Sequence, residues 1–91
     1  MKSLDITEFL KRLYEMENVT VIEVDESMGT VRMGESKTVG ICSNYDKNLE
    51  ILYEDDSFLL IKKSNIQSIK ANDNSIRLDL VDGSYYLFEQ I

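Results

Sequence analysis

The sequence contains no histidine, no proline and no tryptophan, and its one cysteine is Cys42. Without histidine, the commonest general base and transition-metal ligand is missing. A serine or cysteine nucleophile would then depend on lysine or a carboxylate for activation. Cys42 cannot form a disulfide within the chain, which favours a reducing, cytoplasmic setting. It ends a predicted strand, where a small buried hydrophobic residue is the expected role. We therefore expect no catalytic residue, no cofactor and no enzymatic activity.

Basic residues are also scarce, and long apolar runs are absent. Ten Lys and Arg residues stand against 17 Asp and Glu residues, which gives a net charge of −7. Because nucleic-acid-binding faces are normally basic, we expect no direct binding of nucleic acid. No apolar run approaches the length of a membrane span, and the N-terminus lacks the apolar core of a signal peptide, so no membrane association is expected. The charge favours a partner with a basic surface, or else it only keeps a small protein soluble.

The length of 91 residues, with 43% hydrophobic and 30% charged residues, is typical of one soluble domain spanning residues 1–91. Its beginning has the pattern of a helix over residues 5–16. Asp5 and Glu8 form a capping box, and Leu4 and Phe9 occupy the positions of a hydrophobic staple. Asn18 is the expected stop, since asparagine tolerates the left-handed conformation at a helix end. The apolar stripe predicted to face the core contains Ile6, Phe9, Leu10, Leu13 and Tyr14.

From residue 19 to residue 91 the hydrophobic period drops to two, which predicts a β-rich remainder. The predicted extended segments are Val19–Val24, Thr30–Met33, Lys37–Cys42, Leu49–Tyr53, Phe58–Lys62, a short piece around Ile66 and Ile69, and a terminal hairpin. The predicted fold is mainly β: an N-terminal helix packed on a bent antiparallel sheet, or on a small open β-barrel, of six to eight short strands.

The terminal hairpin turns at Asp82-Gly83, a pair that suits a two-residue type I′ turn. This turn would place Leu80 opposite Tyr85 and Leu78 opposite Leu87 on an apolar face. Tyr86 and Phe88 would then lie on the other face of the hairpin. A second layer of a small barrel would cover that face, or else it is exposed to a partner.

Two stretches are rich in acidic residues and fall where the β-rich pattern turns. They are the feature of the chain that most suggests a function. The first, from Leu13 to Val31, contains Glu15, Glu17, Glu23, Asp25 and Glu26. The second, from Asn48 to Ile61, contains Glu50, Glu54, Asp55 and Asp56. We expect them to decorate hairpin tips. Glu54-Asp55-Asp56 lacks the alternating spacing and the glycine of a calcium loop, so no metal site is predicted.

Tyrosine is enriched where proteins meet, because it buries area while its polar tip stays wet. The predicted partner-binding residues therefore combine the acidic tips with aromatic side chains: Glu23, Asp25, Glu26, Tyr53, Glu54, Asp55, Asp56, Tyr86 and Phe88.

The order of elements over residues 5–69 resembles that of Sm-like proteins. The resemblance rests on the helix, Val19-Thr20-Val21, a glycine-bearing middle, Tyr45-Asp46-Lys47-Asn48-Leu49 and the segment from Ile61 to Ile69. It implies a helix-capped five-stranded barrel that assembles into rings. Lys62-Lys63 stand where the family typically has Arg-Gly, and the acidity opposes the RNA binding of that family.

Two functions follow as hypotheses. The first is a non-enzymatic acidic module that binds the basic surface of another protein. In its sharpest form it is an inhibitor of the anti-CRISPR or anti-restriction kind, from a phage or bacterium, which blocks a nucleic-acid-binding site by presenting carboxylates in place of phosphates. The second is a self-assembling small β-barrel, Sm-like in its order of elements, that acts as a structural or scaffold module. A homo-oligomer is possible on either hypothesis.

Overall fold

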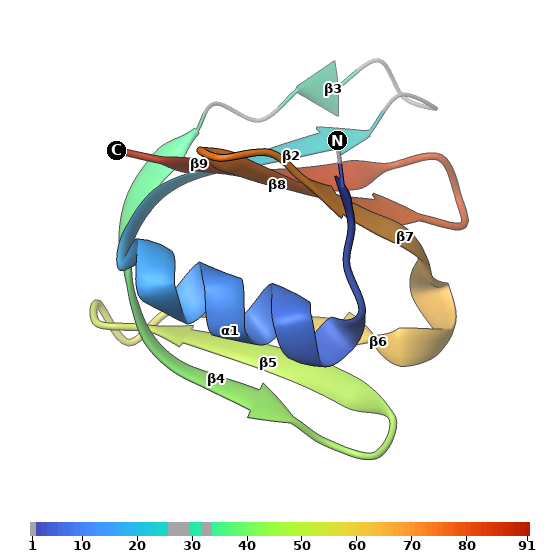
Figure 1. Cartoon of the computed structure of the whole chain (residues 1–91), viewed down its shortest axis with the longest axis horizontal. Helices are drawn as coiled ribbons and strands as arrows, with labels where there is room; N and C mark the ends of the chain where they lie inside the picture. Colours follow the sequence, from blue (N-terminus) through green and yellow to red (C-terminus); the bar gives the residue numbers. More distant parts are fainter. Residues whose placement is uncertain (1, 26–29, 32–33) are drawn as a thin grey trace.

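The computed structural model describes residues 2–25, 30–31 and 34–91, and in these ranges one α-helix accompanies nine β-strands (Figure 1). The elements, in chain order, are β1 (Lys2–Ser3), α1 (Ile6–Met16), β2 (Asn18–Asp25), β3 (Thr30–Val31), β4 (Glu35–Asn44), β5 (Asn48–Tyr53), β6 (Phe58–Lys62), the 3-10 turn η1 (Lys63–Asn65), β7 (Ile66–Ala71), β8 (Ser75–Leu80) and β9 (Tyr85–Gln90).

The strands form one antiparallel sheet in the order β1-β7-β8-β9-β2-β4-β5-β6, with β3 paired to the end of β2. The sheet is not closed, and the helix packs on it, which confirms the predicted fold class. It curls into two layers, joined where β4 bends from one layer to the other (Figure 1). At the bend the pairing of β4 with β5 shifts register between Val39 and Ile41. A β-bulge of this kind bends a strand.

The helix begins as its sequence predicts. The Glu8 N–H donates to the Asp5 carboxylate at 2.8 Å, and the Asp5 N–H donates to the Glu8 carboxylate at 3.3 Å. The predicted stop at Asn18 is wrong by one residue. Glu17 ends the helix with φ at 61°, and Asn18 already begins β2. The carbonyl of Glu17 accepts from the Val39 N–H at 2.7 Å, so the helix end is fixed to the bend of β4.

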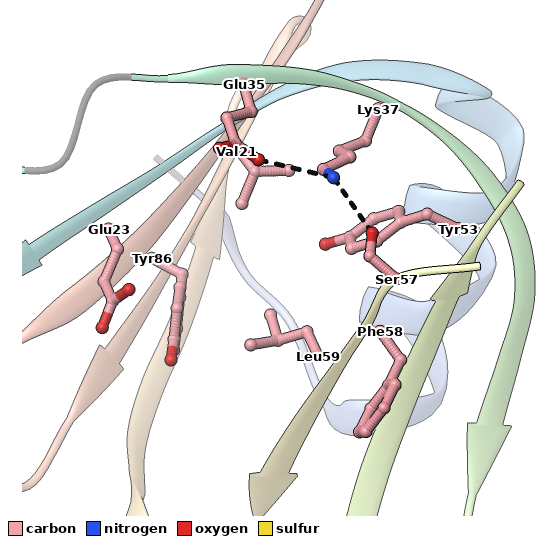
Figure 2. A pocket seen from close by; sticks show the side chains of 9 residues that line it. All are labelled: Val21, Glu23, Glu35, Lys37, Tyr53, Ser57, Phe58, Leu59 and Tyr86. Atoms are coloured by element: carbon pink, nitrogen blue, oxygen red, sulfur yellow. Dashed lines mark hydrogen bonds and ion pairs between the residues drawn. The ribbon is translucent and has the colours of Figure 1, made fainter. Parts of the chain in front are cut away.

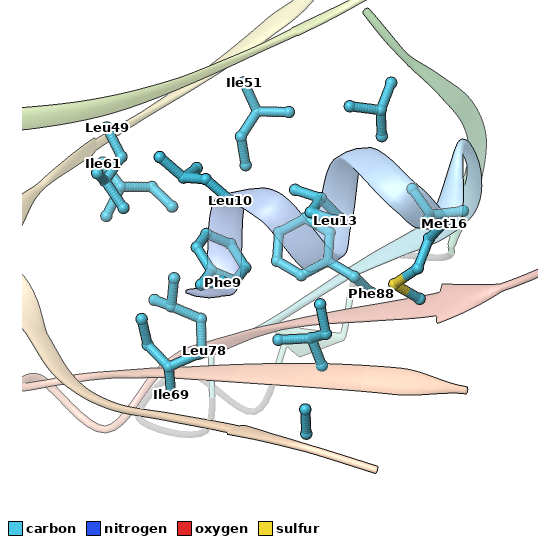
Figure 3. Close-up of a cluster of buried hydrophobic side chains, with 14 of the residues drawn as sticks. Phe9, Leu10, Leu13, Met16, Leu49, Ile51, Ile61, Ile69, Leu78 and Phe88 are labelled. Carbon is cyan, nitrogen blue, oxygen red and sulfur yellow. The ribbon is translucent and has the colours of Figure 1, made fainter. Parts of the chain in front are cut away.

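The core lies between the two layers, with α1 filling the space (Figure 3). Phe9 and Leu13 are fully buried, and the Phe9 ring lies 5.7 Å from that of Phe88. Tyr14, predicted for the apolar stripe, is 60% exposed, and Met16 is buried instead. The buried residues of α1 are Phe9, Leu10, Leu13 and Met16, whose spacing of three or four residues is that of one face of an amphipathic helix, and Tyr14 falls outside that face. The remaining core residues include Leu49, Ile51, Ile61, Ile69, Ile76 and Leu78.

The terminal hairpin differs from its prediction by one residue, and the predicted register is wrong. The Leu80 N–H donates to the Ser84 carbonyl at 2.9 Å, so the loop has three residues rather than two. Gly83 occupies the third position with φ at 92°, which is the left-handed geometry that such a loop requires. As a result Leu78 pairs with Tyr86, and Ile76 pairs with Phe88. The one-residue change moves Tyr86 and Phe88 to the core side of the hairpin.

The stretch that resembles Sm-like proteins does not close on itself as a five-stranded barrel would. Its last strand, β7, pairs with β8 and β1, and the β8–β9 hairpin lies between β7 and β2. The hairpin after residue 71 is therefore an integral part of the sheet. β1 was not predicted at all, since two residues are too few to show an alternating pattern.

Candidate functional site

A pocket of about 220 Å³ opens between the two layers (Figure 2). One wall comes from β2, β4 and β9, and the opposite wall comes from the β5–β6 turn and the start of β6. The lining residues are Val21, Glu23, Glu35, Lys37, Tyr53, Ser57, Phe58, Leu59 and Tyr86. The volume equals that of several water molecules, so the pocket has room for one side chain of a binding partner.

Lys37 is the electrostatic centre of this pocket. Its ammonium group lies 2.6 Å from an Asp55 carboxylate oxygen, 3.0 Å from the Ser57 hydroxyl and 3.4 Å from Glu35. Only 16% of the Lys37 side chain is exposed, whereas 74% of Glu35 is exposed. The two carboxylates neutralise the lysine and leave the pocket mouth negative.

The β5–β6 turn holds Asp55 in place for this ion pair. The backbone N–H of Ser57 donates to the Asp55 carboxylate at 2.9 Å, and the Ser57 hydroxyl donates to the same oxygen. The hydrogen bond from Lys37, followed by those from Ser57, holds the pKa of Asp55 well below its usual range. The bond with Asp55 also raises the pKa of Lys37. Both groups therefore carry full charge near neutral pH.

The hydroxyl of Tyr53 is the unusual group of the site. The residue is 5% exposed, and its oxygen is buried without a hydrogen-bond partner. In Figure 2 this hydroxyl points into the space between Val21, Leu59 and Tyr86. Burial raises the pKa of Tyr53, so the phenol stays neutral. A buried polar atom without a partner is costly, and a ligand group in the pocket could satisfy it.

The structure brings together parts of both acidic stretches. Glu23, from the first, lines the pocket from within β2 rather than from a hairpin tip, and Asp25 is the last residue of that strand. Glu26 lies outside the described residues. From the second stretch, Glu54, Asp55 and Asp56 are exposed on the β5–β6 turn, as predicted. The expectation that acidic residues decorate hairpin tips is thus met at residues 54–56 and wrong for Glu23.

The predicted aromatic contacts separate into two groups. Tyr53 and Tyr86 line the pocket, with Tyr53 buried and Tyr86 half-buried. Phe88 is 0% exposed and packs against Phe9, so it belongs to the core and not to a binding surface. The prediction of Phe88 as a contact residue is wrong because the hairpin register places it on the inner side.

Sequence reasoning missed Glu35, Lys37 and Ser57. Lys37 lies 18 residues from Asp55 in the chain, and the two meet only because β4 and β5 pair across the bend. The alternation of Glu35, Lys37 and Val39 on one strand was a usable signal. It places a charged pair on the same face as a core residue.

Cys42 is half-buried against the core, and desolvation raises the pKa of its thiol. Within the described parts of the chain, no group of three or more His, Cys, Asp and Glu side chains is placed to hold a metal ion. The same parts contain no helix long and apolar enough to cross a membrane.

Comparison of the chain with protein-family models, with curated protein sequences and with solved structures finds no match. Function is therefore inferred from the residues of this chain alone.

Proposed function

We propose that this protein is a non-enzymatic binding module that docks on a basic surface of another protein, with the pocket around Lys37 and Tyr53 at the centre of the interface. The observation that supports this most is the meeting of two acidic stretches, separate in the sequence, at one opening. Glu23 and Glu35 line the pocket, and Asp55 is bonded to its lysine. With the carboxylates of Glu23, Glu35 and Asp55 and the single ammonium group of Lys37, the site is negative overall, which favours a cation as the incoming group.

An arginine side chain of the partner has the chemistry that the pocket requires. Its aliphatic stem would lie against Val21 and Leu59, and its guanidinium group would donate to the exposed carboxylate of Glu35. The Tyr53 hydroxyl would accept one of the remaining guanidinium protons, which satisfies a buried atom that otherwise has no partner. Arginine also has less hydration to lose than lysine when it is buried.

The finer form of this proposal is an inhibitor of a nucleic-acid-binding protein. Sites that bind nucleic-acid phosphates are concentrated cationic surfaces, and an acidic module competes for them by charge. The chain's net charge of −7 and its free Cys42 support an inhibitor working in a reducing cytoplasm, of the anti-CRISPR or anti-restriction kind.

The test uses a nona-arginine peptide as probe, with nona-lysine for comparison, and titration calorimetry at low and at physiological salt. Glu23→Gln/Glu35→Gln should weaken binding of nona-arginine about tenfold, as expected when charge-assisted hydrogen bonds are lost. The matched control is Asp73→Asn/Glu89→Gln, which removes the same charge from exposed residues that do not line the pocket. It should weaken binding much less.

Equal weakening by the two double variants would show that the acidity attracts cations without a specific site. The inhibitor form is tested separately, on a partner captured from the native host. If the captured partner binds DNA equally well with and without a saturating amount of this 91-residue protein, the inhibitor form is excluded. The proposal of a binding module would not be affected by that result.

A further inference from the structure

The last strand of the sheet, β6, offers a free backbone edge. It pairs with β5 on one side, and no other strand of the described chain pairs with its far side. The Tyr53 N–H donates to the Ser57 carbonyl at 2.9 Å, and the Lys63 N–H donates to the Lys47 carbonyl at 2.9 Å. In an antiparallel ladder the bonded residues alternate. The N–H and C=O groups of Phe58, Leu60 and Lys62 therefore point away from β5.

The outward side chains beside this edge are apolar and exposed. Phe58 is 62% exposed, Leu60 is 52% exposed and Ile41 is 59% exposed. The pairing of β4, β5 and β6 aligns Ile41, Leu52 and Phe58 across the outer face of the sheet. Proteins normally protect such an edge with charged residues, proline or a bulge, and the one charged residue of β6 is Lys62 at its end. The register of β6 against β5 is regular, and the strand contains no proline.

The charges around β6 identify the strand that would fit this edge. The acidic turn Glu54–Asp56 comes directly before β6, and Lys62 and Lys63 come at its end. When two such strands pair antiparallel, the beginning of each lies beside the end of the other, so the acidic turn of one copy lies near Lys62 and Lys63 of the other copy at both ends. Parallel pairing would instead place like charges together. The arrangement is complementary to itself.

We propose that two copies of this chain associate by antiparallel pairing of β6 with β6, centred on Leu60. This register places Leu60 opposite the partner's Leu60 and Phe58 opposite the partner's Lys62. The residues with outward backbone groups then face one another, and each such pair exchanges two hydrogen bonds. The interface is isologous, as two-fold symmetry requires. The inference goes beyond the proposed function, and the two share Phe58, which lines the pocket and also lies on the β6 edge.

The first test is Leu60→Pro, followed by sedimentation equilibrium from micromolar to sub-millimolar concentration. Proline removes the Leu60 N–H, which points away from β5, so the ladder inside the protein keeps its bonds. The parent protein should be a dimer, and Leu60→Pro should be a monomer with a similar circular dichroism spectrum. Val81→Lys is the control, because Val81 is 61% exposed on the β8–β9 turn, and it should remain a dimer.

Variants with changed charges at the two ends of β6 test the proposed dimer even if Leu60→Pro fails to fold. Lys62→Glu/Lys63→Glu makes both ends of the strand acidic, and Glu54→Lys/Asp56→Asn removes the acidity of the first end. Each variant alone should dimerise about tenfold more weakly than the parent, because like charges then lie near each other at the ends of the paired strands. An equimolar mixture of the two should recover a heterodimer. A monomeric parent at all concentrations, or a mixture that associates no better than its components, would overturn the proposal.

Discussion

At the scale of single residues, Lys37 and Asp55 form a close ion pair. The ion pair spans 2.6 Å and joins β4 to the β5–β6 turn. Because the folded-state pKa of Asp55 is lowered, chiefly by its hydrogen bond with Lys37, folding favours the ionised carboxylate. Its contribution to stability is present above the unfolded pKa of about 4 and is lost as the pH falls through the folded value.

The pKa of Lys37 is raised, so the lysine contributes with the opposite sign of pH dependence. Its contribution is full below the unfolded value of 10.5 and is lost as the pH rises through the folded value. Together the two groups stabilise the fold between about pH 4 and about pH 10.

Asp55→Asn tests this pH window. The variant should be less stable than the parent at pH 7, and the difference should shrink as the pH falls below about 4, because the parent then loses the same charge. Urea unfolding at stepwise lower pH measures the effect. Asp56→Asn is the control, since Asp56 makes no ion pair among the described residues and its φ of 69° is one that asparagine tolerates. A difference that does not shrink at all between about pH 4 and about pH 2 would mean that Asp55 stabilises the fold without its charge.

Tyr53→Phe tests the cost of the buried hydroxyl. An unsatisfied buried polar group costs about 1–3 kcal/mol, so its removal should raise the free energy of unfolding by about 1 kcal/mol. The ring keeps its packing and its contact with the Lys37 ammonium group, 5.7 Å from the ring centroid. Urea unfolding gives the change in stability. A clear loss of stability would instead show that the hydroxyl has a partner in solution, such as a bound water.

At the scale of elements, α1 connects the two layers. Phe9 and Leu13 are fully buried in the core, between the layer that contains β8 and β9 and the layer that contains β4 and β5. Leu13→Ala should therefore cost about 2–5 kcal/mol of unfolding free energy. Tyr14→Ala, at the neighbouring exposed position, should change it by less than about 0.5 kcal/mol. If the two variants have similar stabilities, α1 does not pack as described.

The β8–β9 hairpin depends on the backbone of Gly83. Its φ of 92° is strained for a residue with a side chain, although a Cβ there would meet nothing within 4 Å. Gly83→Ala should therefore cost about 1 kcal/mol through the backbone alone. Gly83→Asn should cost less, because asparagine tolerates positive φ. Thermal unfolding of both variants measures the difference, and equal stability of Gly83→Ala and the parent would contradict a left-handed residue at this position.

These elements show what local sequence can determine. The capping box and the apolar spacing of α1 act within a few residues, so the helix and its start were predictable. The hairpin at residue 83 was placed correctly, but its loop length was not. A two-residue and a three-residue loop differ by one residue in register, and that residue decides which face is buried. The pocket was not predicted, because Lys37 lies 18 residues from Asp55 in the chain and the two meet only through the pairing of β4 with β5.

At the scale of the whole molecule, the net charge of −7 is spread over principal extents of 30 × 29 × 26 Å. At about 10 mM salt the Debye length is about 30 Å, so every charge interacts with every other one. At about 0.15 M salt it is about 8 Å, and only close neighbours still interact. Screening therefore removes the long-range repulsion among carboxylates and affects the short Lys37–Asp55 pair much less.

Raising NaCl from about 10 mM to about 0.15 M at pH 7 should consequently increase the melting temperature. A gain of about 1 kcal/mol corresponds to about 4–8 °C in a domain of this size. The same increase in salt near pH 4.4, where the calculated net charge is zero, should have little effect. Scanning calorimetry at both pH values provides the measurement. A melting temperature that falls with salt at pH 7 would show that attractive ion pairs outweigh the net repulsion, and that the acidic surface stabilises the fold.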